Sequence, residues 1–311
     1  MFLRRLPINR LPSVRVASFS AAIVRPATVS LTALRFNASI TNQQAPHPKA
    51  VKDALTKTDD KSPLNSKDYV LFHPVYSPEE LAATKYTHRE VKGVQDTIAF
   101  SLVTIMRAVF DYSTGYVDKT GIMTEKQWLN RILFLETVAG VPGMVAGMSR
   151  HMRSLRLLRR DHGWIHTLLE EAENERMHLL TFMKLKNPHD FDWPDIRGPF
   201  FRAAVLLTQG VFFNFYFLCY LLSPQTCHRF VGYLEESAVH TYTLCLKDIE
   251  EGRIKHWGTQ PAPEIARFYW QLPDNATVRD VVAAVRSDEA DHRDTNHVLA
   301  GLKADDPNPV A

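Results

Sequence analysis

Two Glu-x-x-His pairs lie on helical stripes of otherwise apolar residues. Glu175 and His178 continue a stripe that begins ten residues earlier, and Glu289 and His292 continue a stripe of valines within 278–285. Steps of three and four residues keep each stripe on one face of a helix, so both pairs should point inward. A buried charge without a partner is very costly. The pattern therefore predicts an internal site where these groups meet one another or a metal ion.

Two further glutamates, Glu136 and Glu235, interrupt apolar stripes in the same way. Four inward carboxylates outnumber the two imidazoles, and a pair of divalent ions would balance their charge. Two Glu-x-x-His elements with one Glu from each of two other helices form the di-iron carboxylate arrangement of four-helix bundles. Mixed oxygen and imidazole ligands with open positions favour iron that reacts with dioxygen. We therefore predict two Fe ions, with six candidate ligands: Glu136, Glu175, His178, Glu235, Glu289 and His292.

Helical spacing dominates the chain from about residue 90 onward, and the alternation typical of strands is scarce. Start signals support several helices: Thr124 precedes a long periodic run, Ser223 precedes Pro224, and Thr277 with Asp280 suggests a capping box. We predict an all-α fold, a ferritin-like four-helix bundle with two additional amphipathic helices that dock on a membrane. The expected helices are 91–112, 125–158, 160–186, 197–222, 224–251 and 276–302.

The two docking helices are the apolar stretches 91–112 and 200–222. The second is long enough to cross a bilayer. Arg202 and Gln209, however, lie seven residues apart on one face, and charge at the bilayer centre is unfavourable. We expect a helix that lies in one leaflet, with a membrane span and a buried core helix as the alternatives.

The first 40 residues contain six arginines, five serines and no acidic residue. This composition is typical of a mitochondrial presequence, with a disordered basic tail as the alternative. We assign residues 1–60 to a presequence and linker, and residues 61–311 to a single di-iron helical domain. Beyond residue 52 acidic residues outnumber basic ones, so nucleic acid is not an expected partner. Three cysteines without a C-x-x-C pair exclude a disulfide scaffold.

The segments that carry the candidate ligands resemble the alternative oxidases of mitochondria. The resemblance rests on four motifs in the family's order, and it extends over roughly residues 90–300. The motifs are LET at 135–137 followed by AGVPGMVAGM, NERMHL at 174–179, LEESA at 234–238, and RSDEADH at 286–292.

The resemblance implies a ubiquinol oxidase on the matrix face of the inner mitochondrial membrane. It would reduce O2 to water, resist cyanide, form a homodimer and, lying in one leaflet, pump no protons. By motif match the six candidate ligands bind iron, and Tyr242 is the family's redox-active tyrosine. The matching residues that orient the ligands are Asn174, Asp288, Tyr269 and Trp270. The matching quinol positions are Arg131, Leu135, Ala238 and Thr241.

His228, seven residues before Glu235, is a further candidate to accept a quinol proton, and Arg107 is another candidate for the quinol site. For Arg131, an ordinary ion pair is the alternative. The family's motif usually has a third glutamate where this chain has Ser237, which bears on the quinol pocket rather than on the metal ligands. The first cysteine is Cys219, so an N-terminal regulatory disulfide of the plant type cannot form in these residues.

Two other functions fit the same ligand pattern. A di-iron hydroxylase of the quinone ring would share the metals and the membrane, but it would add oxygen to its product. A ferritin-like iron-storage bundle would not need the two apolar docking stretches.

Overall fold

The computed structural model describes residues 71, 73–114, 116, 123–186 and 198–311. The chain divides into two compact units, Met1–Leu55 and Thr56–Ala311, and all described residues belong to the second. The predicted presequence and linker, residues 1–60, lie outside the described residues.

The described residues are mostly helical, as predicted. No strand occurs among them, and a single antiparallel bridge joins Pro261 and Thr277. The helices are α2 (Pro78–Ala83), α3 (Gly93–Thr114), α4 (Glu125–Ala139), α5 (Val141–Leu157), α6 (Trp164–Leu185), α7 (Pro199–Leu222), α8 (Pro224–Glu250), α9 (Glu264–Tyr269) and α10 (Val278–Leu299).

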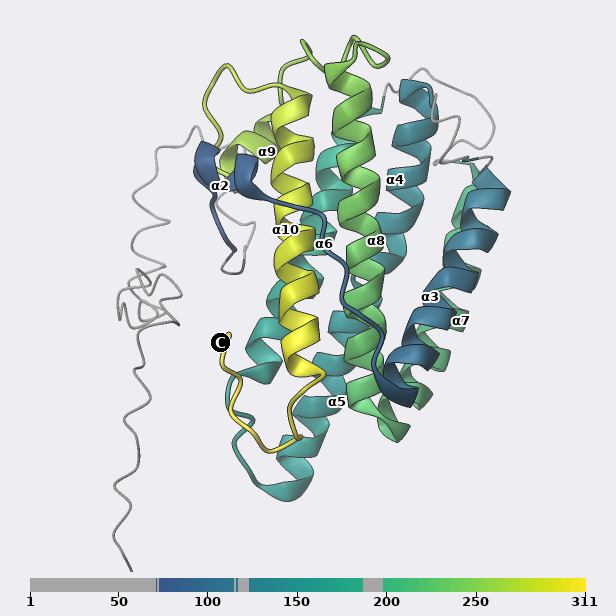
Figure 1. Ribbon diagram of the computed structural model, residues 1–311, viewed down its shortest axis with the longest axis vertical. Helices are drawn as coiled ribbons and strands as arrows, with labels where there is room; N and C mark the ends of the chain where they lie inside the picture. The colour runs from purple at the N-terminus through teal and green to yellow at the C-terminus, as the bar shows by residue number, and fades with distance from the viewer. Residues whose placement is uncertain (1–70, 72, 115, 117–122, 187–197) are drawn as a thin grey trace, which may run out of the picture. The chain divides into compact units, whose positions relative to one another are not determined.

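Helices α4, α6, α8 and α10 form the bundle that holds the candidate ligands, and they stand upright in Figure 1. Helix α8 packs along α10, and α4 packs along α6. Helix α3 packs on α8, whereas α7 packs mainly on α5. Both α3 and α7 appear at the right-hand edge of the view in Figure 1.

The predicted start signals cap their helices. The hydroxyl of Thr124 accepts the backbone N–H of Gln127 at the start of α4, and Ser223 accepts that of Thr226 at the start of α8. Thr277 and Asp280 form the expected capping box at the start of α10. Each cap satisfies backbone groups that a helix end leaves without an intrahelical partner.

The prediction of one continuous helix over 125–158 is wrong. The helix ends at Ala139 and restarts at Val141, with Gly140 as the junction. Pro142 lies in the first turn of α5 and has no N–H to donate to the preceding turn, which favours a new helix start there. Gly140 and Pro142 therefore separate α4 from α5.

Small residues let α5 approach α6 closely. A Cβ atom placed on Gly143 would lie 2.7 Å from the backbone oxygen of Leu168, and one on Gly147 would lie 3.2 Å from a methyl group of Leu169. At these two positions α5 therefore lies in close contact with α6.

We therefore expect Gly143→Ala to destabilise the protein by about 1–3 kcal/mol, because the new methyl group meets backbone that cannot move away alone. The matched control is Gly210→Ala in α7, where the added Cβ meets nothing within 4 Å. Thermal unfolding checks both variants. An unchanged midpoint for Gly143→Ala would contradict the close packing of α5 on α6.

Two apolar clusters enclose the middle of the bundle. One joins α4, the C-terminal half of α8 and the N-terminal half of α10, and it includes Trp128, Phe182 and Trp257. The other joins α3, α5, α7 and the opposite ends of α8 and α10, and it includes Trp164 and Phe230. The candidate ligands lie between these clusters along α6, α8 and α10, so they form a polar layer inside an apolar core.

Helices α3 and α7 expose much of their apolar surface. The exposed side chains of α3 include Ile105 and Val109, and those of α7 include Leu206, Val211 and Leu222. By length and composition, three helical stretches are apolar enough to cross a membrane: Gly93–Thr114, Glu125–Leu157 and Pro199–Leu222. The stretch Glu125–Leu157 is 44% buried and holds a bundle helix, whereas α7 is only 11% buried. Of the three stretches, α3 and α7 therefore leave most of their apolar surface exposed.

Candidate metal centre

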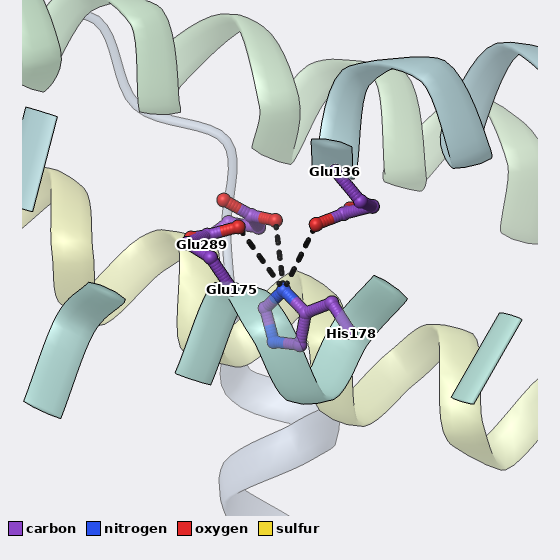
Figure 2. A group of neighbouring side chains, drawn as sticks. All are labelled: Glu136, Glu175, His178 and Glu289. Carbon is purple, nitrogen blue, oxygen red and sulfur yellow. Dashed lines mark ion pairs between the residues drawn. The ribbon is translucent and has the colours of Figure 1, made fainter. Parts of the chain in front are cut away.

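Four of the predicted ligands converge on one point. Ligand atoms of Glu136, Glu175, His178 and Glu289 all lie within 4.8 Å of one another, and all four residues are buried. Figure 2 shows three carboxylates directed at the imidazole of His178. The Nδ1 atom of His178 lies 3.6 Å from Glu136 Oε2, 3.4 Å from Glu175 Oε2 and 3.5 Å from Glu289 Oε1. These groups come from α4, α6 and α10, which are separate segments of the sequence.

The two remaining predicted ligands adjoin this group. Glu235 on α8 is buried and hydrogen-bonds with Glu289, and its pKa is raised well above normal by burial and by Glu289. The Nδ1 atom of His292 lies 2.8 Å from Glu175 Oε1. The structure thus brings all six candidate ligands into one buried layer.

The donor set fits a metal pair, because several of its atoms are buried without a hydrogen-bond partner. These atoms are Glu136 Oε2, Glu175 Oε2 and His178 Nδ1. Buried polar atoms in folded proteins nearly always have partners, so a cluster of unpartnered acceptors needs an explanation. Carboxylate oxygens and imidazole nitrogens that converge in this way suit cations with mixed oxygen and nitrogen ligands.

Asp288 organises the side chains behind the cluster. Its Oδ2 atom lies 2.9 Å from His178 Nε2, and it accepts hydrogen bonds from Asn174 (3.0 Å) and Trp270 (2.8 Å). Asn174 also donates to the hydroxyl of Tyr269. The four predicted orienting residues therefore surround His178 on the side away from the carboxylates. A metal-binding histidine commonly donates its second N–H to a carboxylate in this manner.

Two residues of the N-terminal segment complete this network, and the sequence analysis missed both. The hydroxyl of Tyr76 donates to Asp288 Oδ1 at 2.7 Å, and the ring of His73 stacks on Tyr269 with centroids 3.7 Å apart. Neither residue lies in a helix, so helical periodicity carried no signal for them. Figure 1 shows the segment that follows α2 running across α10 and α8, where Thr84 bonds with Ser287.

Tyr242 lies directly at the cluster. It is buried, and its hydroxyl donates a hydrogen bond to Glu136 Oε1. The carboxylate and burial together hold the pKa of Tyr242 well above normal, so the phenol keeps its proton.

The predicted quinol residues fall in two places. Arg131 is buried against α3, where it pairs with Asp111, donates to Thr114 and lies 4.4 Å from the ring centroid of Phe110. Leu135 shares α4 with it, whereas Ala238 and Thr241 lie on α8. His228 is almost fully buried in the other apolar cluster, between Tyr220 and Asn296. The structure therefore separates His228 from Arg131.

Comparison with known proteins decides the family. A family model described as alternative oxidase matches residues 76–301. The chain belongs to the alternative oxidase family. This confirms the resemblance found in the four motifs, and it makes the chain an oxidoreductase.

Curated relatives in the alternative oxidase family cover most of the chain. Each is named a mitochondrial alternative oxidase, and each match covers 77% of this chain and 68% of the relative. The protein of Emericella nidulans is 55% identical over 249 residues, that of Ajellomyces capsulatus 52% over 252, and that of Yarrowia lipolytica 49% over 248. Their names support a mitochondrial location for this chain.

Several of the buried candidate ligands hold protons when no cation is present. Burial raises the pKa of Glu136 to about 8, and it raises that of a neighbouring carboxylate, Glu171, to about 7. Burial lowers the pKa of His292, but the neighbouring Glu175 carboxylate outweighs burial and raises this pKa to about 10. For Glu175 the two histidines outweigh burial, and its pKa falls below normal.

We expect the metal-free protein to lose stability as the pH rises from about 5 to about 8. Glu136 and Glu171 hold protons in the folded state over this range, whereas the unfolded chain has already released them, so unfolding becomes more favourable as the pH rises. The raised pKa of His292 also makes the folded protein lose stability as the pH rises above the ordinary pKa of histidine. The lowered pKa of Glu175 stabilises the folded protein, and this effect is already at its full value at pH 5.

Urea unfolding of the chelator-treated protein at pH 5, 6.5 and 8 measures this dependence. Divalent metal should restore most stability at the highest pH, because metal competes with protons for the same atoms. A urea midpoint that stays constant or rises with pH would contradict the assignment of protons to the cluster.

Proposed function

We propose that this chain is a di-iron ubiquinol:oxygen oxidoreductase that reduces O2 to water. The observation that carries the proposal is the convergence of Glu136, Glu175, His178 and Glu289, with unpartnered buried atoms on the first three of them. Membership of the alternative oxidase family supports the same function. The enzyme is insensitive to cyanide and lies on the matrix face of the inner mitochondrial membrane.

Glu136, Glu175, Glu235 and Glu289 would hold the two iron ions, with His178 and His292 beside them. Iron held there would supply the redox chemistry that reduces O2. Oxidation of two ubiquinols releases four electrons and four protons, which convert one O2 into two waters. The protein holds the ligand side chains in a buried layer that excludes water, and it supplies protons at defined atoms.

His178 is oriented by Asp288. If Nε2 donates its hydrogen to the Asp288 carboxylate at 2.9 Å, the lone pair of Nδ1 faces the three glutamates. This tautomer is the one that a metal requires. Tyr242 would give a hydrogen atom or an electron to the site, because its hydroxyl bonds directly to Glu136.

The exposed apolar faces of α3 and α7 support attachment to one leaflet. A helix that lies in the interface buries its apolar face in lipid and keeps its polar groups in water. Gln209 turns toward the protein, where it donates to the backbone of Thr137 on α4 at 2.6 Å. An enzyme attached in this way has no path across the bilayer, so it would pump no protons.

Quinol would enter beside these helices. We assign its ring to Arg131, Leu135, Ala238 and Thr241, with His228 as a more distant proton acceptor. Asp111 connects this region to a cavity of about 330 Å³ between α3 and α8, because it pairs with both Arg131 and Arg107. Arg107 and Ser237 line the cavity and hydrogen-bond to each other.

A second copy of the chain would pack on α5. This helix exposes Met144, Met148 and Met152, which are four residues apart and therefore form one stripe, and Leu155 extends it. An exposed apolar stripe of this kind suits a symmetric contact, and we propose a homodimer.

We expect Glu175→Ala to abolish ubiquinol-dependent oxygen uptake and to lower iron content, because both oxygens of Glu175 face the cluster. Oxygen consumption by membranes that contain the protein, with cyanide present, and iron analysis of the purified protein measure the two effects.

The control for this experiment is Glu173→Gln on the same helix, since Glu173 pairs with the exposed Arg176 instead. This control should keep both iron and activity. Normal oxygen uptake by Glu175→Ala would refute the metal assignment, and incorporation of labelled oxygen into the quinone would favour a hydroxylase.

We expect Thr241→Val to raise the KM for ubiquinol about tenfold with iron content unchanged, as is typical when one hydrogen bond to a ligand is lost. Among the described residues the hydroxyl bonds only to the carbonyl of Ser237 on its own helix, so the fold loses little. Thr243→Val is the matched control, because its hydroxyl makes the same bond to Val239. Equal KM values for the two variants would remove Thr241 from the quinol site.

A further inference from the structure

A series of hydrogen bonds between four buried side chains leads from α7 to the proposed metal centre. The hydroxyl of Tyr220 lies 3.1 Å from His228 Nε2, and His228 Nδ1 lies 2.9 Å from Asn296 Oδ1. Asn296 Nδ2 then donates to Glu171 Oε2 at 2.8 Å. Each of the four residues lies on a different helix, and none is more than 8% exposed. Metal ligation uses none of them.

The hydrogen bonds determine which atom donates and which accepts at each step of this series. The Asn296 amide nitrogen donates both to Glu171 and, at 3.0 Å, to the backbone oxygen of His292. The Asn296 oxygen therefore faces His228, whose Nδ1 must carry a hydrogen. This leaves His228 Nε2 as an acceptor for the hydroxyl of Tyr220. Burial lowers the pKa of His228 to about 4, which agrees with a neutral ring.

The inner end of this series of hydrogen bonds lies beside a proposed metal ligand, His292. Asn296 lies one turn after His292 on α10 and binds its backbone. Glu171 lies one turn before Glu175 on α6, and its carboxylate helps to raise the pKa of His292. The carboxylate and amide together therefore hold α10 against α6 at the height of His292.

The outer end of this series of hydrogen bonds lies on α7, the helix proposed to face the lipid. Tyr216 and Tyr220 are the buried residues of α7. The hydroxyl of Tyr216 has no hydrogen-bond partner among the described residues, whereas that of Tyr220 bonds to His228. The contact of Tyr220 thus joins the hydrogen-bond network of the core to α7.

We propose that Glu171 and Asn296 are positioning residues that set the geometry of His292, and that His228 and Tyr220 extend this support to the lipid-facing helix α7. The inference rests on the proposed metal site and adds to it. A polar network that served only to satisfy buried groups would not change how the site binds metal, so metal binding distinguishes the two roles.

The test measures Fe²⁺ affinity by competition with a chelator, and the visible spectrum of the Co²⁺-loaded protein, in the full chain. Glu171→Gln keeps the shape of the side chain and removes its charge, and it should weaken Fe²⁺ binding about tenfold and shift the Co²⁺ bands. Tyr220→Phe removes one hydroxyl group and should cause a smaller loss in the same direction. Because both act through Asn296, the double variant should lose less than the product of the two effects.

Matched controls lie beside both residues. Glu170→Gln changes the neighbouring glutamate, which pairs with His166 at the surface, and Tyr216→Phe removes the unpartnered hydroxyl from the same helix. Both controls should bind Fe²⁺ like the unchanged protein.

The outcomes separate the two proposals. An unchanged protein that binds no Fe²⁺ would overturn the metal site itself. A protein that binds Fe²⁺ normally, with Glu171→Gln and Tyr220→Phe indistinguishable from their controls in affinity and Co²⁺ spectrum, would overturn the positioning role alone. Should Glu171→Gln fail to fold, Tyr220→Phe with its control still decides the question.

Discussion

The need to neutralise carboxylates inside an apolar core governs this structure. Glu136, Glu175, Glu235 and Glu289 lie between two apolar clusters, each buried too deeply for water to compensate its charge. Such groups must bind protons, cations or metal ions. The two histidines offset only part of the charge, which explains why Glu136 and Glu235 have raised pKa values without metal. A metal pair would replace those protons and join four helices at one point.

The rest of the fold holds these charges in place. Asp288 bonds directly to His178, and it accepts hydrogen bonds from Asn174 and Trp270. The N-terminal segment adds Tyr76 to the same carboxylate. The break at Gly140 separates α4 from α5 so that α5 can pack closely on α6 through Gly143. Meanwhile α3 and α7 leave their apolar faces exposed. A buried candidate metal site beside an exposed apolar surface would suit the proposed oxidation of a membrane-soluble quinol.

Much of the bundle could be predicted because its stripes obey helical periodicity. The inward direction of Glu175, His178 and Glu289 followed from steps of three and four residues, and the structure places them together. Periodicity could not show the break at Gly140, since the apolar stripe continues through it. Nor could it place Tyr76, which lies outside the helices, or Glu171, which gains its importance from Asn296, 125 residues away. Such long-range partners depend on how helices pack, and spacing along one helix does not contain that information.

The most direct test of the central claim is a crystal structure of the iron-loaded protein with anomalous diffraction measured at the iron edge. The account predicts two iron peaks per chain, both between Glu136, Glu175, Glu235 and Glu289, with His178 and His292 beside them. No iron peak in this layer, with the carboxylates instead paired through protons, would contradict the claim that these charges are buried to hold a redox-active metal pair.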